Sequence, residues 1–295
     1  MVDLTYKIGD SRDLMKEIPP QSIALIITSP PYWNVKNYEQ ESQIGYSQSY
    51  QEYIDSLNQV WEECHRVLVP NGKICVDIQP IPITKTLRGS EAERSSILNI
   101  MNDIEQYMRS IKLDLSNIFI WDKRKYNNQM IFGSYPYPPN LYSHIAFEYI
   151  YVFRKEGKSR KVSDDIKEKS TISKEDWRNF CFNSIWDIPP VIKFGQDKND
   201  ILSHIAPFPI EIPRRLIRLF SFVDDTILDP FLGSGTTLGA CALEDRNGIG
   251  FELNGDYEDL IKLTISDPLK RPTWKQAKIV NKNYQLTDFL RKEGE

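Results

Sequence analysis

Residues 226–237 read TILDPFLGSGTT, and the predicted fold class follows from this stretch. Its apolar start predicts a strand, and the Ala- and Leu-rich residues after it predict a helix. Gly233 and Gly235 let the backbone turn tightly between the two, where free N–H groups at the helix start can face a ligand. This order predicts an α/β protein with a cofactor site, and a purely structural glycine turn is the alternative.

The glycine spacing separates three classes of ligand. A P-loop requires lysine where Thr236 stands, which disfavours nucleoside triphosphates. The dinucleotide fingerprint GxGxxG does not fit, because Gly239 comes one residue too late. S-adenosylmethionine needs a close glycine turn, an acid for the ribose and an apolar wall for adenine. The side chains that suit these needs are Asp229, Pro230, Phe231 and, at the end of the next predicted strand, Glu252.

A second unusual stretch, TSPPYW, occupies residues 28–33 and follows the apolar run SIALII. That run predicts a central parallel strand that is buried on both faces. Two prolines can simply end such a strand, because proline lacks the N–H group that the ladder needs. The same residues also suit the rim of a pocket that holds a flat ring with an amino group.

Strand and helix patterns alternate along much of the chain, which predicts parallel strands joined by right-handed crossovers. Ser11 is predicted to cap a short helix at 11–18, and residues 95–112 to form a longer one. The segment PNG at 70–72 predicts a turn before a strand. Residues 143–155 predict either a strand pair or one bent strand.

The composition is typical of a soluble globular protein. Of the 295 residues, 40% are hydrophobic and 26% charged, and the net charge of −4 does not by itself indicate a nucleic-acid binder. No apolar stretch approaches the ~20 residues of a membrane span, and the N-terminus lacks signal-peptide features, so we expect a cytoplasmic protein. Four scattered cysteines and three dispersed histidines predict neither a metal site nor a disulfide framework.

Together the two motifs resemble those of the DNA amino-methyltransferases. TSPPYW is similar to their (S/N/D)PP(Y/F) signature and DPFLGSGTT to their cofactor loop, and the catalytic-first order resembles their beta group. Shorter segments extend the resemblance over about residues 3–263: GDSRDL at 9–14, NSIWDIPP at 183–190 and HIAPFP at 204–209. It implies a Rossmann-like S-adenosylmethionine-dependent methyltransferase fold, with a mostly parallel twisted sheet, helices on both faces and a permuted motif order.

The resemblance assigns the catalytic role to Ser29, Pro30, Pro31 and Tyr32. The Ser29 hydroxyl and the Pro30 carbonyl would orient the amine of a flipped base, which would stack on Tyr32. The methyl group would pass by direct displacement, without a covalent enzyme intermediate. The cofactor residues that the resemblance implies are Asp10, Thr28, Phe208, Asp229, Pro230, Phe231, Gly233, Gly235, Thr236 and Glu252.

The resemblance also divides the chain. Residues 1–154 would form the catalytic half of the methyltransferase domain and 203–264 its cofactor-binding half, with a target-recognition insert at 155–202 and a tail at 265–295. The basic run 154–161 is our choice for phosphate contacts in the recognition region. Three arginines of a later helix fit either a solvated face or a DNA-facing stripe: Arg214, Arg215 and Arg218.

We therefore expect a site-specific DNA methyltransferase that modifies the exocyclic N4 amine of cytosine. In the resembled family, serine at the first motif position goes mostly with cytosine N4 and aspartate with adenine N6, so Ser29 favours cytosine and N6-adenine is the alternative. A catalytically inactive DNA-binding regulator is an alternative of another class, and RNA is a weaker substrate candidate. Double-stranded DNA is the expected partner; a homodimer and a cognate restriction endonuclease are left open, and no membrane association is expected.

Overall fold

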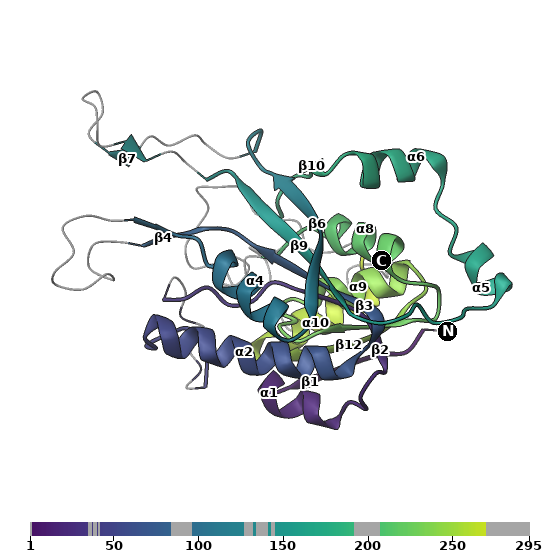
Figure 1. Cartoon of the computed structure of the whole chain (residues 1–295), viewed down its shortest axis with the longest axis horizontal. Coiled ribbons are helices and arrows are strands. Elements are labelled where there is room, and N and C mark those ends of the chain that lie inside the picture. Colours follow the sequence, from purple (N-terminus) through teal and green to yellow (C-terminus); the bar gives the residue numbers. More distant parts are fainter. Residues whose placement is uncertain are drawn as a thin grey trace, which may run out of the picture.

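An eight-stranded, mostly parallel sheet runs through the computed structural model of the chain (Figure 1). The structure describes residues 2–34, 37, 40, 42–83, 96–126, 132–133, 141–142, 145–191 and 207–269. Among the eight strands, β9 alone runs antiparallel to its neighbours, so the predicted sheet is confirmed. In spatial order the strands are β1 (Leu4–Ile8), β12 (Asn247–Glu252), β11 (Thr226–Asp229), β2 (Ile23–Thr28), β3 (Leu68–Ile78), β9 (Phe147–Lys155), β6 (Leu113–Asp122) and β10 (Ile185–Asp187).

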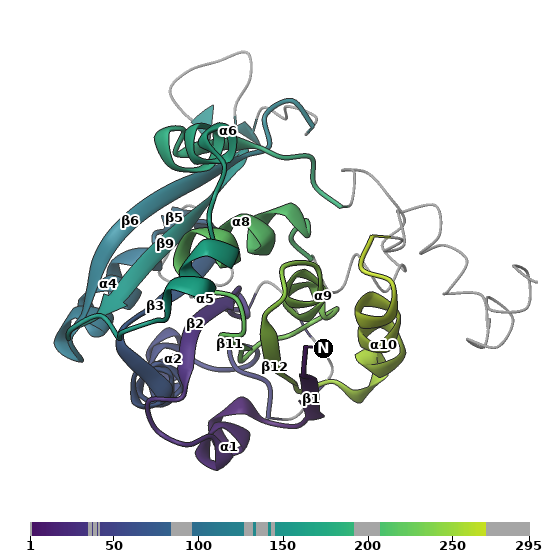
Figure 2. The same ribbon diagram turned by 90° about the vertical axis from the view of Figure 1, so that its right-hand side faces the viewer.

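Helices cover both faces of this sheet, as Figure 2 shows. One face carries α1 (Ser11–Leu14), α2 (Tyr50–Val67) and α4 (Met101–Ser110), and the other carries α8 (Glu211–Phe220), α9 (Thr236–Leu243) and, packed on α9, α10 (Glu258–Ser266). Side chains alternate between the faces along each strand. Ile26 of β2 therefore joins the core with α2 and α4, whereas Leu25 and Ile27 join the core with α8 and α9.

Shorter elements complete the described part of the chain. Two small antiparallel sheets stand apart from the main one, β4 (Ile81–Ile83) with β5 (Ser96–Leu98) and β7 (Phe132–Gly133) with β8 (Leu141–Tyr142). Short helical segments are η1 (Met15–Glu17), α5 (Asp164–Lys169), α6 (Lys174–Trp177), η2 (Arg178–Phe182) and η3 (Gly255–Tyr257). Across the residues described, no helix combines the length and the apolar character that a membrane span requires.

Two local predictions were wrong. Asp10, not Ser11, caps α1: its carboxylate accepts a hydrogen bond of 2.9 Å from Arg12 N, and Ser11 is the first helical residue. The predicted turn at 70–72 lies inside β3, as a bulge where the register against β2 shifts. Asn71 has φ +62° there, and a Cβ on Gly72 would lie only 2.9 Å from the Val69 carbonyl oxygen, so glycine permits the bulge.

Two further predictions were too coarse. Residues 95–112 form a helix only over Met101–Ser110, because residues 96–98 pair with β4 as a strand. The segment 143–155 contains one described strand, β9, rather than a pair. At the C-terminus, α10 continues to Ser266, two residues into the predicted tail, and residues 270–295 lie outside the described residues.

Candidate active site

The two motifs of the sequence meet at one edge of the sheet. β2 and β11 are parallel neighbours, with Leu25 paired to Ile227, so the two strands end at the same edge of the sheet. Their last residues are joined by a hydrogen bond of 2.9 Å from the Thr28 hydroxyl to Asp229 Oδ1, across 201 positions of sequence. Such an edge, at the carboxyl ends of parallel strands, is where open α/β sheets bind ligands.

A pocket of about 710 Å³, partly open to solvent, lies at this edge. Its walls come from the β1–α1 turn, the TSPPYW loop, the segment 42–44, the glycine-rich loop and the end of β12. Seven of the predicted site residues line it: Asp10, Ser29, Pro31, Pro230, Phe231, Gly233 and Glu252. The structure therefore brings together parts of both motifs around one cavity.

Glu252 is an acidic residue of this pocket. Its carboxylate accepts hydrogen bonds from Gly233 N at 2.7 Å and Asn254 N at 2.8 Å, which tie the end of β12 to the glycine-rich loop. Burial raises the pKa of Glu252 to about 7, although these N–H groups act in the opposite direction. A carboxylate in this position can accept hydrogen bonds from ribose hydroxyls.

Asp229 lies behind the pocket and is fully buried. Besides the Thr28 hydroxyl, it accepts hydrogen bonds from Phe231 N at 3.1 Å and from the Thr237 hydroxyl at 2.5 Å. Burial raises its pKa to about 6, and these three donors counteract the shift. Asp229 thus holds the loop in shape and does not itself line the pocket.

Gly235 and Thr236 also stand behind the pocket wall. Gly235 has φ +83° where α9 begins, and a Cβ there would lie 3.2 Å from the Cα atom of Ile261. The buried Thr236 hydroxyl is 3.1 Å from the Ser234 hydroxyl. Both residues shape the glycine-rich loop from the side of α9 and α10, and neither lines the cavity.

Hydrogen bonds with neighbouring segments hold the TSPPYW loop in place, and two of its polar atoms remain available to bind a ligand. The Pro31 carbonyl accepts a hydrogen bond of 2.8 Å from the Tyr53 phenol of α2, and Trp33, buried under the loop, donates to the Gln48 carbonyl at 2.9 Å. Among the described residues, no partner bonds the Ser29 hydroxyl or the Pro30 carbonyl. These two acceptors can therefore receive an amino group.

Comparison with known proteins supplies the family. The N6/N4 DNA methylase family matches residues 23–263 of the chain. The chain belongs to the DNA methylase family. The Type II methyltransferase M.MjaI of Methanocaldococcus jannaschii is 35% identical over 299 residues, 92% of this chain and 95% of that protein. M.MthZI of Methanothermobacter thermautotrophicus is 31% identical, over 87% of this chain and 75% of the relative.

Solved structures agree with this DNA methylase in fold. TTHA0409 of Thermus thermophilus, solved in complex with S-adenosyl-L-methionine, has a TM-score of 0.70 at 33% identity and covers 91% of this chain and 97% of its own. The cytosine-N4-specific PvuII DNA methyltransferase has a TM-score of 0.60 at 20% identity, with 95% and 92% covered, and supports the fold alone. The predicted family and the predicted fold are confirmed.

Asp10 and Phe208 occupy different places in the DNA methylase. Asp10 lines the pocket. Its carboxylate also caps α1 and forms an ion pair with the Arg12 guanidinium at 2.5 Å. Phe208 belongs to the core cluster on the α8 side and does not line the pocket, so its contact with adenine stays a prediction. Residues 204–206 of the same motif lie outside the described residues.

The sequence did not predict a buried polar cluster of Asp77, Lys123 and Glu148. Asp77 follows Val76, which pairs with Thr28, so its backbone lies beside Ser29. It is 3% exposed, and its Oδ1 has no hydrogen-bond partner within the described chain. Burial, and after it the charge of Glu148, raises the pKa of Asp77 well above its usual value, whereas Lys123 lowers it.

Lys123 and Glu148 connect this cluster to the predicted base-stacking ring. They form an ion pair in which the two side chains are 12% and 13% exposed. The Tyr32 phenol donates to the other Glu148 oxygen at 3.3 Å and accepts from Gln79 N at 3.3 Å. In the sequence, this cluster is indicated only by the aspartate within the apolar segment KICVDI. Aspartate is seldom fully buried unless its charge is paired, so its presence in such a strand points to a polar partner.

Lys36 and Tyr38, which follow the TSPPYW segment in the chain, and the histidines His144 and His204 lie outside the described residues. Among the residues described, no group of three His, Cys, Asp or Glu side chains is placed to hold a metal ion.

Proposed function

We propose that this DNA methylase transfers the methyl group of S-adenosylmethionine to the N4 amine of cytosine at a specific site in double-stranded DNA. The observation that supports it most is the position of the Ser29 hydroxyl and the Pro30 carbonyl, which have no partner among the described residues. Ser29 lines the pocket, and Pro30 lies between the two lining residues Ser29 and Pro31. Serine at the first motif position favours cytosine N4, and adenine N6 is the alternative.

The pocket residues fit the proposed cofactor. S-adenosylmethionine supplies, when bound, a methyl group on a positively charged sulfur. Glu252 offers acceptors for ribose hydroxyls, Pro230 and Phe231 offer an apolar wall, and Gly233 allows a close approach of the backbone. This prediction agrees with the relative TTHA0409, which was solved with the same molecule.

The chain's own residues prepare the amine for attack. Ser29 Oγ and the Pro30 carbonyl accept the two amino hydrogens, which turns the nitrogen lone pair toward the methyl group. Tyr32, anchored through its phenol, presents its ring to the flipped base, and such stacking contributes ~1–3 kcal/mol. Asp77, beside Ser29, accepts the proton that the amine releases.

The biological setting is part of the proposal. The relatives that carry the name Type II methyltransferase favour a place in a restriction–modification system, with a cognate endonuclease as partner. Double-stranded DNA is the proposed substrate and the cytoplasm the proposed location. A homodimer stays a prediction.

The decisive experiment supplies methyl-labelled S-adenosylmethionine and mixed-sequence DNA, and identifies the modified nucleoside by mass spectrometry. We expect N4-methylcytosine. N6-methyladenine instead would establish the alternative target. Label that stays on the cofactor, although the protein binds DNA, would contradict the enzymatic proposal and support a regulator. A parallel reaction with RNA tests the third substrate class.

A further inference from the structure

The two ends of β9 lie at opposite edges of the sheet because this strand is antiparallel to its neighbours. Phe147 pairs with Asp122 at the edge of the sheet where β3 ends, the edge that also holds the pocket, whereas Arg154 pairs with Lys73 near the start of β3. Arg154 lies six positions after Glu148, a distance of about 20 Å along a strand. The basic run 154–161, which the sequence favoured for DNA contacts, therefore begins at the edge remote from Ser29. In Figure 1, β4, which follows the end of β3, lies at the left, and α5, which follows the run 154–161, lies at the right.

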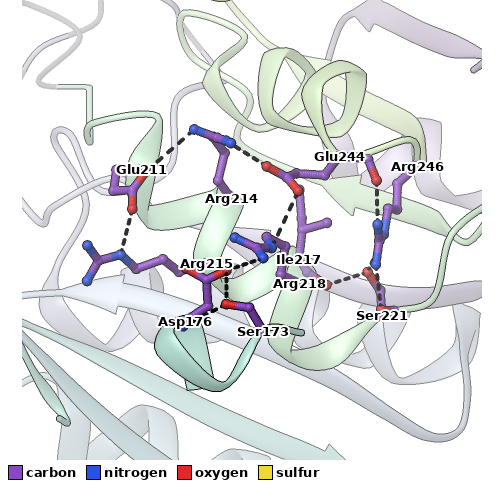
Figure 3. Close-up of polar contacts among 10 residues, drawn as sticks. All are labelled: Ser173, Asp176, Glu211, Arg214, Arg215, Ile217, Arg218, Ser221, Glu244 and Arg246. Atoms are coloured by element: carbon purple, nitrogen blue, oxygen red, sulfur yellow. Dashed lines mark hydrogen bonds and ion pairs between the residues drawn. The ribbon is translucent and has the colours of Figure 1, made fainter. Parts of the chain in front are cut away.

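The segment that follows this run is packed against the body of the protein. Trp186 is 1% exposed in the core with α8, and the Arg215 guanidinium lies 4.6 Å from the ring centre of Phe180. Arg218 pairs with Asp176 at 2.6 Å (Figure 3). The described part of the predicted insert is thus anchored on the α8 face of the sheet.

The arginines of α8 are engaged in the same anchoring. Figure 3 shows Arg214 reaching Glu244, at 2.7 Å, and Arg215 reaching Glu211 of its own helix, at 2.8 Å. With Arg218 held by Asp176, each of these cations has an acidic partner inside the protein. This network favours neither a bare solvated face nor a DNA-facing stripe.

A different basic group, Lys123, Arg124 and Lys125, follows β6 directly at the pocket edge. β6 and β3 both pair antiparallel with β9, so the end of β6 lies at the same edge as the end of β3. Lys123 pairs with Glu148, which accepts the hydrogen bond of Tyr32. Arg124 thus stands one residue beyond the cluster that holds the proposed stacking ring.

Arg124 and Lys125 also retain donors for another anion. Their side chains are 70% and 72% exposed, and they pair with Asp122 and Asp187. Asp122 uses Nε and Nη2 of Arg124, at 3.0 and 2.7 Å, and leaves Nη1 available. One ammonium hydrogen of Lys125 suffices for Asp187, and exposed ion pairs of this kind contribute little to stability. A phosphate can therefore bind both side chains without a rearrangement of the fold.

We propose that Arg124 and Lys125 bind the phosphate backbone of the substrate DNA beside the flipped base, and that the basic run 154–161 does not contact it. This inference rests on the proposed function, because it assumes that duplex DNA approaches the edge at which Ser29 and Tyr32 lie. The proposed contact with the DNA backbone thus lies at the end of β6 and not in the predicted insert.

The test compares two double variants that remove the same charge. R124Q/K125Q alters the pocket edge, and K158Q/K161Q alters exposed lysines at the remote edge. Binding of duplex DNA is measured from 50 to 200 mM salt, together with the affinity for S-adenosylmethionine. For R124Q/K125Q we expect about tenfold weaker DNA binding and a salt slope smaller by about 1.8, since each phosphate contact contributes about 0.9.

K158Q/K161Q should keep both the DNA affinity and the salt slope, and both variants should bind the cofactor within twofold of the wild type. Equal losses of DNA affinity in the two variants would show that only the net charge of the protein matters, and would overturn the inference. A loss of DNA affinity in K158Q/K161Q alone would also overturn it. The proposed function is judged separately, by methyl transfer of the wild-type enzyme. A wild type that methylates DNA while R124Q/K125Q keeps its salt slope refutes this inference and leaves the proposed function standing.

Discussion

Two carboxylates near the glycine-rich loop, the buried Asp229 and the half-buried Glu252, have different partners and so different roles. Asp229 directs its oxygens to donors within the protein, the hydroxyls of Thr28 and Thr237 and the N–H of Phe231. Glu252 binds backbone N–H groups at the mouth of the loop and lines the pocket. The first carboxylate organises the site, and the second is the one that a ligand can reach.

Glu252→Gln should weaken binding of S-adenosylmethionine at least tenfold. An amide keeps the size of the side chain but offers one acceptor oxygen in place of two, so it bonds ribose hydroxyls less well. Calorimetric titration measures the affinity, with Glu258→Gln, outside the pocket, as the matched control. Equal affinities for wild type and E252Q would remove Glu252 from the cofactor site.

Glu252 also predicts a pH dependence of stability. Its pKa is about 7 in the folded protein and 4.5 as the ordinary value, so the folded state holds the proton more tightly. The free energy of unfolding should therefore fall as pH rises from about 4.5 to 7, by up to about 3 kcal/mol from this group. Urea unfolding at several pH values should show that E252Q lacks this part of the slope. A variant as pH-dependent as the wild type would contradict the assignment.

Asp77→Asn should lower turnover at least tenfold and leave cofactor affinity within twofold. The substitution preserves shape but removes the buried carboxylate of a residue whose backbone lies beside Ser29, and proton transfer by a positioned side chain typically contributes about 10²–10⁴-fold. Steady-state methylation measures the effect, and Asp114→Asn, exposed at the remote end of β6, is the control. Unchanged turnover in D77N would make Asp77 a structural residue.

At the scale of elements, the glycine-rich loop depends on how closely α9 and α10 approach each other. Gly235 begins α9 in a left-handed conformation, with Ile261 of α10 directly against it. The approach leaves no room for a side chain, and the loop conformation at the pocket follows from it. The geometry of the glycine-rich loop is therefore set partly by α10, a helix that follows it in the chain.

Gly235→Ala should lower the free energy of unfolding by ~1–3 kcal/mol, since a Cβ meets backbone at 3.2 Å and φ is +83°. Gly255→Ala is the matched control, because its Cβ would make only ordinary contact with Ile8 at 3.7 Å. Chemical unfolding compares the two variants. Equal stabilities of G235A and G255A would show that the loop relaxes at no cost.

At the scale of the whole molecule, a buried side-chain hydrogen bond links the ends of two neighbouring strands that are far apart in the sequence. Thr28 ends β2 and Asp229 ends β11, and the buried contact between them holds the start of the TSPPYW segment against the start of the glycine-rich loop. On the α8 face of the sheet, the ion pairs of α8 with α6 and with the end of α9 anchor the described part of the predicted insert (Figure 3). The pocket edge and the anchored segment thus occupy different parts of the molecule.

Thr28→Val should cost ~1–3 kcal/mol of unfolding free energy, because it leaves a buried carboxylate oxygen of Asp229 without its donor. Thr226→Val, in the neighbouring strand, makes the same change at a hydroxyl with no recorded partner among the described residues. Urea unfolding of both variants separates the hydrogen bond from the general effect of valine. A loss of equal size in T226V would show that the contact contributes nothing specific.

The sequence by itself determined the family, the mostly parallel sheet and the two motifs that border the pocket. These features are local: an apolar run such as SIALII, a pair of prolines and a glycine turn each act through neighbouring residues. The same reasoning did not predict the bulge at Asn71 and Gly72. A Pro-Asn-Gly segment has the sequence pattern of a turn even where, as here, the strand continues through it.

The tertiary structure alone revealed the cluster of Asp77, Lys123 and Glu148 and the edge at which each basic segment lies. The physical reason is strand direction. Periodicity shows that residues 147–155 form a strand, but only pairing with β3 and β6 shows that it runs antiparallel. That direction carries Arg154 away from the pocket and sets Glu148 against Tyr32, and no local pattern contains it.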